Sequence, residues 1–309
     1  MRGCAGGIDL TAPRYDEEEE TPESKIGFTI EVKGLQGGHS GMDIHRGLGN
    51  ANKLMNRLLF DTFESFGLRI SEIDGGSLRN AIPRESRAVV AVDAVHEAAF
   101  VEAMNSKANA IKTELKTMEP QLEVIISATD APEKIMDLGI QEGLLRALYA
   151  TLNGVYRMSA DIEGLVETSN NIARVIVNAG QIIIGCLTRS SVETSKWDMA
   201  NTLVSTFELI GCEVSCDGDY PGWTPNMDSP ILKVLKETYT NLNGQPPHVA
   251  ACHAGLECGI LGTHYPEMDM ISFGPTIKGA HSPDERASIA SVKKYWAFVL
   301  EILKAIPEA

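Results

Sequence analysis

The sequence predicts an α+β protein in which a domain of two similar halves precedes a smaller α/β segment. Two groups of apolar segments follow one another in a recurring β-α-β-β-α-β order, and turn-forming residues gather at 217–225. The 309 residues also suffice for more than one core. We expect the first domain over 1–216, with halves at roughly 25–127 and 132–216, and the second segment over 217–309.

The first half is expected to begin after a solvated loop. Residues 16–20 form an acidic run followed by Pro22, which is typical of a surface loop. Beyond it, residues 27–32 alternate between apolar and polar side chains, as in a half-buried strand. The apolar spacing then predicts a helix over 48–60, strands over 68–73 and 86–92, a helix over 97–118 and a strand over 122–126.

The second half should repeat this arrangement, with each sheet covered by helices on one face. Its expected elements are a helix over 140–152, a short strand over 154–158, strands over 165–177 and 181–187, a helix over 195–210 and a strand over 212–216. The remaining residues predict a helix over 231–242, a strand over 268–273, a long polar loop and a closing helix over 291–306. These are too few strands for a complete sheet, so the second segment is expected to need a partner segment.

Composition narrows the classes of partner. The net charge of -15 and the pI near 4.9 disfavour nucleic acids and anionic membranes, because the field of the protein repels phosphates. No apolar run approaches the roughly 20 residues that span a bilayer, and no signal-peptide core follows Met1, so we expect a cytoplasmic protein. The six cysteines lack CxxC spacing and are expected to be free thiols; Cys212 and Cys216 show no further partners for a metal.

Two histidines lie in loops that could carry chemistry. His281 occurs in the loop GPTIKGAHSPDER, where a neutral imidazole suits a zinc ligand or an acid-base role, although a loop histidine bonded to Asp284 is equally compatible. His39 occurs in GLQGGHSG, where nearby glycines let the backbone approach another surface closely; a simple turn histidine is the alternative.

Other polar residues stand at comparable places in the two halves. Asn80 lies in GGSLRNAIPRE, and Asn171 and Arg189 lie between 165 and 190, where an amide and a guanidinium could bind a peptide carbonyl and a carboxylate. His253 and Glu257 occur in CHAGLECG and are further candidates for substrate binding. The alternative for Asn80, Asn171 and Arg189 is that they are ordinary exposed polar residues at strand ends. The alternative for CHAGLECG is a buried hydrogen-bonded turn. No HExxH, Walker A, GxSxG, dinucleotide or HxD motif is present.

Several runs, in order along the whole chain, closely resemble the aminoacyl-histidine dipeptidases. They are GCAGGID, KGLQGGHSGMDIHRGLGNANKL, GGSLRNAIPRE, GLVETSNN, YPGWTP, HAGLECG, YPEMDM and GPTIKGAHSPDE. This family, also called Xaa-His or cytosol non-specific dipeptidases, is related to carnosinase among the dizinc exopeptidases. The resemblance implies a doubled ferredoxin-like lid, used for dimerisation, followed by the C-terminal part of a zinc-exopeptidase catalytic domain.

The same resemblance implies roles for individual residues. His281 matches the C-terminal zinc ligand, and His39 matches the lid histidine that steadies the tetrahedral oxyanion, in related dimers at the partner's active site. Asn171 and Arg189 look like binders of the substrate backbone and carboxylate, with Asn80 as a weaker candidate in the other half. The implied reaction is hydrolysis of dipeptides by a metal-activated water, and the implied assembly is a homodimer through the lid.

The motifs that the family carries upstream have no counterpart in these 309 residues. They are an HxD motif, a bridging aspartate, a Glu-Glu pair and a further aspartate. We therefore expect that the missing partner of this chain is the metal-binding N-terminal half. Alone, the chain is expected to bind zinc weakly or not at all and to be inactive. The alternative is a non-catalytic dimerisation or peptide-binding remnant.

Overall fold

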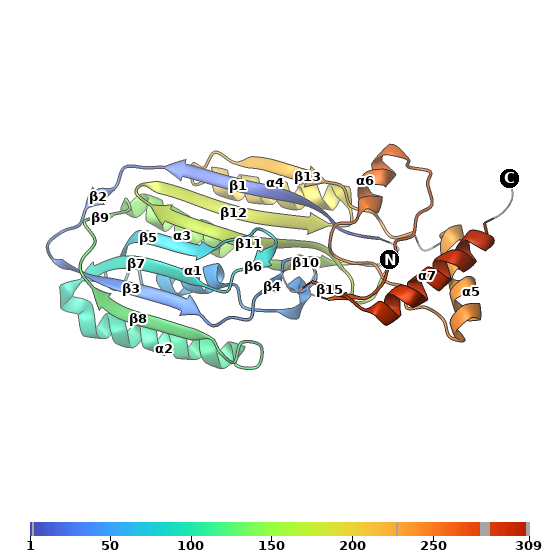
Figure 1. The fold of residues 1–309 in the computed structure, drawn as a ribbon. Helices are drawn as coiled ribbons and strands as arrows, with labels where there is room; N and C mark the ends of the chain where they lie inside the picture. The colour runs from blue at the N-terminus through green and yellow to red at the C-terminus, as the bar shows by residue number, and fades with distance from the viewer. Residues whose placement is uncertain (2, 227, 279–284, 307–309) are drawn as a thin grey trace.

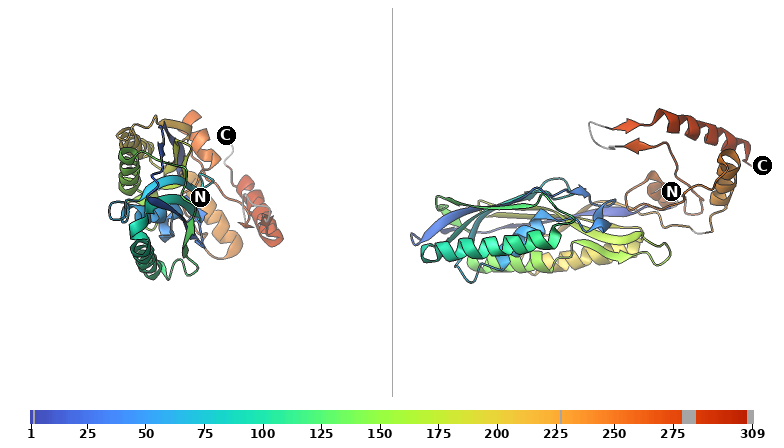
Figure 2. Two further views of the ribbon diagram at one scale, coloured as in Figure 1. Left: turned by 90° about the vertical axis from the view of Figure 1, so that its left-hand side faces the viewer. Right: turned by 90° about the horizontal axis from the view of Figure 1, so that it is seen from below.

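A nine-stranded antiparallel sheet forms most of the molecule, with four long helices along one face and the C-terminal segment at one end (Figures 1 and 2). This computed structural model describes residues 1, 3–226, 228–278 and 285–306. The mixed α/β class predicted from the sequence is confirmed.

The first half has the strand order of a ferredoxin-like unit. Its elements are β3 (Lys25–Lys33), α1 (Ala51–Phe60), β5 (Arg69–Gly76), β7 (Ser86–Asp93), α2 (Glu97–Leu115) and β8 (Glu123–Thr129). The strands lie in the order β5-β7-β3-β8, so each helix crosses over the sheet to a strand parallel to the one before it. Every element expected in this half is present, with its ends shifted by a few residues. Helix α1 begins at Ala51 because the side chain of Asn50 caps it, accepting hydrogen bonds from the backbone N–H groups of Asn52 and Lys53.

The second half takes its first strand from the beginning of the chain. Its elements are β1 (Gly6–Tyr15), α3 (Leu138–Ala150), β11 (Val166–Asn178), β12 (Gln181–Ser190), α4 (Glu193–Glu208) and β13 (Ser215–Tyr220), and the strand order is β13-β1-β12-β11. The whole first half is therefore inserted between β1 and α3. No strand was predicted at 6–15, and this prediction is wrong. The predicted strand over 154–158 is present, but as the short side strand β10 (Gly154–Met158) paired with β11.

The two halves join through equivalent strands. β5 and β11 are each the second strand of their half, and they pair antiparallel with Arg174 opposite Gly76 and Val177 opposite Ile73. This is the self-complementary edge contact that a two-fold symmetric dimer would use, made here within one chain. Buried residues of both halves, among them Ile30, Phe100 and Phe207, form one continuous core.

Two short pairings tie the loops to this frame. β2 (Glu19–Glu20) pairs with β9 (Lys134–Ile135), so part of the acidic run forms a small strand rather than the fully solvated loop that was expected. β4 (Gly38–His39) pairs antiparallel with β6 (Ala81–Ile82), which lies beyond α1 and β5 in the chain, and this short ladder holds His39.

The C-terminal segment consists of helices with little sheet. It contains α5 (Pro230–Asn243), α6 (Glu257–His264), the pair β14 (Ile277–Lys278) and β15 (Arg286–Ala287), and α7 (Ile289–Lys304). The predicted strand over 268–273 is wrong, since these residues are in no strand. The chain start holds this segment to the first domain, because Cys4 bridges both Trp223 and Cys252 through its backbone. All six cysteines are free, and no helix of the described residues is long and apolar enough to cross a membrane.

Candidate functional site

The loop that carries His39 lies directly against the C-terminal segment. Ser40 donates its backbone N–H to the carbonyl of Asn80 at 2.8 Å, which extends the pairing of β4 with β6 by one hydrogen bond. A Cβ atom on Gly41 would lie 2.0 Å from the carbonyl oxygen of His253. Only glycine allows this contact, so the close backbone approach expected from the glycines around His39 is present.

The imidazole of His39 is oriented by its own loop. Its Nδ1 atom accepts hydrogen bonds from the backbone N–H groups of Gly41 and Met42, at 3.0 and 3.1 Å. Asp43 accepts the backbone N–H of His39 at 2.9 Å and fixes the turn. A neutral ring with Nδ1 as acceptor carries its proton on Nε2, so this tautomer makes Nε2 a hydrogen-bond donor.

Arg189 is a buried cation with neutral partners. The residue is 5% exposed; its Nη1 donates to the hydroxyl of Tyr220 at 2.6 Å and its Nε to the hydroxyl of Ser40 at 3.4 Å. Among the described residues, no carboxylate lies within ion-pair distance of this guanidinium. The carboxylate of Asp9 interacts with this guanidinium only from beyond ion-pair distance. A buried charge without a direct ion pair is costly, and a guanidinium is shaped to bind a carboxylate through two parallel hydrogen bonds. The arrangement is therefore suited to an anionic group of a ligand.

His253 lies beside this cation and is held neutral. Its Nε2 is 2.7 Å from the hydroxyl of Ser169, and its buried Nδ1 has no hydrogen-bond partner in the described part of the chain. Burial, and secondly the positive charge of Arg189, lower the pKa of His253 to about 3. The ring of His253 therefore adds no second positive charge at neutral pH, and the positive charge of the cluster is that of Arg189.

The two candidate asparagines differ in whether their side-chain amides are free to bind a ligand. Asn171 is fully buried, and its side-chain N–H groups donate to the carbonyls of Arg79 and Ala81 at 3.2 and 2.8 Å. It therefore supports the segment that pairs with the His39 strand. Asn80 is exposed directly before β6. In the described structure its side chain makes no hydrogen bond, which leaves its amide available to a ligand.

The remaining candidates stand apart from this cluster or outside the description. Glu257 is exposed in the first turn of α6 and makes no described contact with Arg189 or His253. His281 lies outside the described residues. Within those residues, no three histidine, cysteine or carboxylate side chains gather in a way that could hold a metal ion, so they do not by themselves fit a zinc site.

Three residues of the cluster were not predicted. Ser40, Ser169 and Tyr220 bond to Arg189 or His253, and each sits within a run of sequence that was noted for other reasons. Ser40 follows His39 directly, and Tyr220 lies in the turn-rich stretch 217–225, which was interpreted as a domain boundary and contributed the run YPGWTP to the resemblance. The His39 loop therefore lies next to Arg189 and His253 of the same chain.

Comparisons with known proteins agree over the whole chain. Residues 30–119 match the peptidase dimerisation domain. The chain is 42% identical over 305 residues to the cytosol non-specific dipeptidase of Escherichia coli strain K12, covering 99% of the chain and 63% of that protein. The crystal structure of aminoacylhistidine dipeptidase from Vibrio alginolyticus superposes with a TM-score of 0.92 at 40% identity, over 100% of this chain and 63% of that one. The chain thus spans somewhat less than two thirds of the length of these relatives.

Proposed function

The chain is related over its whole length to the aminoacyl-histidine dipeptidases, and from this relationship we propose that it forms the lid and part of the catalytic domain of a dipeptidase. In this proposal the cluster around Arg189 binds the C-terminal carboxylate of a dipeptide. The observation that carries the proposal is the buried guanidinium whose described partners are the neutral hydroxyls of Tyr220 and Ser40.

The neighbouring side chains have complementary tasks in this proposal. By its match to the lid histidine of the resembled family, His39 would steady the oxygen that becomes negative as the peptide carbonyl is attacked, with its ring oriented by the two backbone donors to Nδ1. Asn80 binds the substrate backbone, because its amide is available while that of Asn171 is used inside the protein. His253 lies beside Arg189 as a neutral group.

Zinc, a homodimer and a cytoplasmic location complete the proposal. Zinc rests on the resemblance of the sequence motifs, the homodimer on the match to a dimerisation domain, and the location on the name of the Escherichia coli relative. His281 would be a ligand if two zinc ions activate the attacking water, but we derive no step through a metal from the described residues. The match to a peptidase dimerisation domain supports self-association through the lid. We expect the 309 residues alone to hydrolyse no dipeptide at an appreciable rate; turnover by a pure sample would contradict this.

The carboxylate site is tested by comparing one ligand with and without that group. L-alanyl-L-histidine and its C-terminal amide are titrated into the chain, and binding is followed by NMR chemical shifts. The free dipeptide should bind more tightly than the amide, and Arg189→Lys should weaken the free dipeptide by about 10- to 100-fold while changing the amide little, because the bidentate fork is lost. Arg87→Lys, on the exposed face of β7, is the control. Equal affinities for the two ligands would refute the assignment.

The competing function, a peptide-binding remnant without catalysis, makes the same binding prediction. The two functions are distinguished by measuring dipeptide hydrolysis after the chain is joined to a metal-binding segment of the relatives' kind. Hydrolysis that depends on His39 favours the dipeptidase, and binding without hydrolysis favours the remnant.

A further inference from the structure

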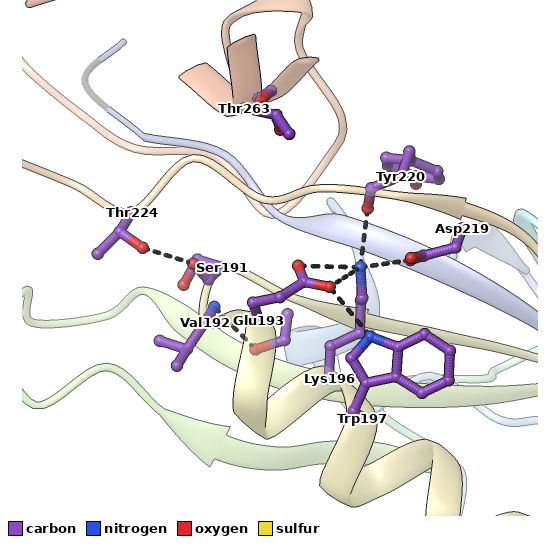
Figure 3. A network of polar contacts seen from close by, with 11 residues as sticks. Ser191, Val192, Glu193, Lys196, Trp197, Asp219, Tyr220, Thr224 and Thr263 are labelled. Carbon is purple, nitrogen blue, oxygen red and sulfur yellow. Dashed lines mark hydrogen bonds and ion pairs between the residues drawn. The ribbon is translucent and has the colours of Figure 1, made fainter. Parts of the chain in front are cut away.

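A buried lysine lies where the first domain ends and the C-terminal segment begins (Figure 3). Lys196, on α4, is fully buried, and its Nζ atom contacts Glu193 at 2.8 Å and Asp219 at 2.5 Å. The same amine donates to the backbone carbonyl of Tyr220 at 3.0 Å. All three donor positions of the ammonium group are therefore used, and one of them fixes the last residue of β13.

The side chain of that last residue reaches Arg189. The hydroxyl of Tyr220 accepts the Nη1 hydrogen bond of Arg189 at 2.6 Å. Glycines leave room for its ring on both sides: a Cβ on Gly7 would lie 2.5 Å from the hydroxyl oxygen, and one on Gly255 would lie 2.9 Å from a ring carbon. Tyr220 is thus fixed through its backbone by Lys196 and through its ring by packing, while its hydroxyl holds the guanidinium.

We infer that Tyr220 is a positioning residue, held in place by Lys196, that orients the Arg189 guanidinium for the carboxylate of a ligand. This inference rests on the proposed function for the role of Arg189. Tyr220 itself touches Arg189, and no contact of Tyr220 with the reacting groups is required.

The chemistry of a tyrosine suits this task better than that of an acid. An aspartate or glutamate at the same place would form an ion pair with the guanidinium and compete with the ligand carboxylate, whereas a neutral hydroxyl restrains one N–H group without adding a negative charge. A free arginine side chain also has rotamer entropy that ligand binding would have to overcome. Restraint before binding removes part of that cost.

The test uses Tyr220→Phe, which keeps the ring and removes only the hydroxyl. The matched control is Tyr15→Phe, which removes a tyrosine hydroxyl that accepts a hydrogen bond from Gln181 at the far end of β1. The first readout needs no ligand: rotation of the Arg189 guanidinium about its Cζ–Nε bond, measured by NMR of the side-chain N–H groups. Rotation should be slow in the wild-type chain and in Tyr15→Phe, and faster in Tyr220→Phe.

The second readout is the affinity for L-alanyl-L-histidine relative to its C-terminal amide. Tyr220→Phe should weaken the free dipeptide by about 3- to 10-fold and leave the amide unchanged, as expected for one lost hydrogen bond to a group that remains charged. Lys196→Met should change both readouts in the same direction, because the end of β13 is then released.

The outcomes separate this inference from the proposed function. Unchanged guanidinium rotation in Tyr220→Phe overturns the positioning role whatever the ligand does. Faster rotation with an unchanged preference for the free dipeptide, while Arg189→Lys abolishes that preference, also overturns it and leaves the proposed function intact. If the wild-type chain shows no preference for the free dipeptide, the carboxylate site fails, and the role of Tyr220 in ligand binding fails with it.

Discussion

At the scale of single residues, the cluster depends on keeping His253 neutral. The ring is 5% exposed and lies close enough to Arg189 for that cation to disfavour its protonation. Its pKa is therefore lowered from 6.5 to about 3. In the unfolded chain the same ring would titrate near its ordinary value, so the two states bind different numbers of protons at mildly acidic pH.

This difference predicts a loss of stability in acid. Between pH 6.5 and pH 3 the unfolded chain holds a proton on His253 that the folded chain does not, so the stabilisation present above pH 6.5 falls as the pH falls. From pH 7 to pH 5 the free energy of unfolding should drop by about 2 kcal/mol more in the wild type than in His253→Gln. Urea unfolding of both proteins at both pH values measures this, and equal drops would show that His253 titrates normally.

The residues that sequence could identify are those whose chemistry is unusual for their setting. A histidine among glycines and an arginine at a strand end, His39 and Arg189, stand out without a structure. Ser169 and Tyr220 do not, because a serine in a strand and a tyrosine before a turn are ordinary. Their importance comes from one hydrogen bond each, to residues 84 and 31 positions away along the chain.

At the scale of elements, periodicity predicted the helices and most strands but not β1. Strand β1 runs through Gly6 and Gly7 and contains Pro13, features that argue against a central strand. The structure accommodates the proline because β13 pairs with β1 only from Gly7 to Thr11, so Pro13 lies beyond the paired region on that side. The predicted strand at 268–273 fails for the converse reason: an apolar run forms a strand only beside a partner strand, and the described residues supply none there.

The two edges of the long sheet differ in their capacity to pair. At one edge, β13 carries Asp217 and Asp219, and its register with β1 shifts between Gly7 and Asp9, which are features that block a further strand. At the other edge, β8 has no charged residue after Glu123. If the lid associates by an edge, β8 is therefore the strand that pairs.

The double variant Ser127→Lys and Thr129→Lys should convert the dimer to a monomer. Both side chains are exposed on β8, and lysines on an edge strand repel a second copy of that strand. Sedimentation velocity of the chain measures the change, with Ser215→Lys on the exposed end of β13 as the control. A dimer that survives the β8 changes but not the β13 change would reverse the assignment of edges.

At the scale of the whole molecule, the two parts of the chain are unequally packed. The first domain buries a core shared by both of its halves, whereas the helices of the C-terminal segment bury only a few apolar side chains, such as Leu232, Leu235 and Phe298, and expose others, such as Trp296 and Leu303. The first domain therefore provides the frame, and the candidate site lies where the C-terminal segment meets it, through the contact of Gly41 with His253.

The same architecture bears on which chain each His39 serves. The resemblance implied a lid histidine that reaches the active site of the partner subunit, but here the insertion of one half into the other joins two equivalent halves of one sheet within a single chain, with the His39 loop against the His253 of the same chain. We therefore predict that His39 acts on the site of its own chain, even if the protein is a dimer.

Mixing inactive variants tests this prediction. His39→Ala and His281→Ala proteins, each joined to a metal-binding segment of the relatives' kind, are mixed, and hydrolysis is measured after subunit exchange. If His39 acts within its own chain, no dimer contains an intact site and the mixture stays inactive; if it acts on the partner, heterodimers hold one intact site and activity returns. Native mass spectrometry of the mixture confirms that the subunits have exchanged, and wild-type protein taken through the same exchange confirms that the procedure preserves activity. Recovery in the mixture of the two variants would show that the partner supplies His39 after all, and that the contact between Gly41 and His253 does not define the working site.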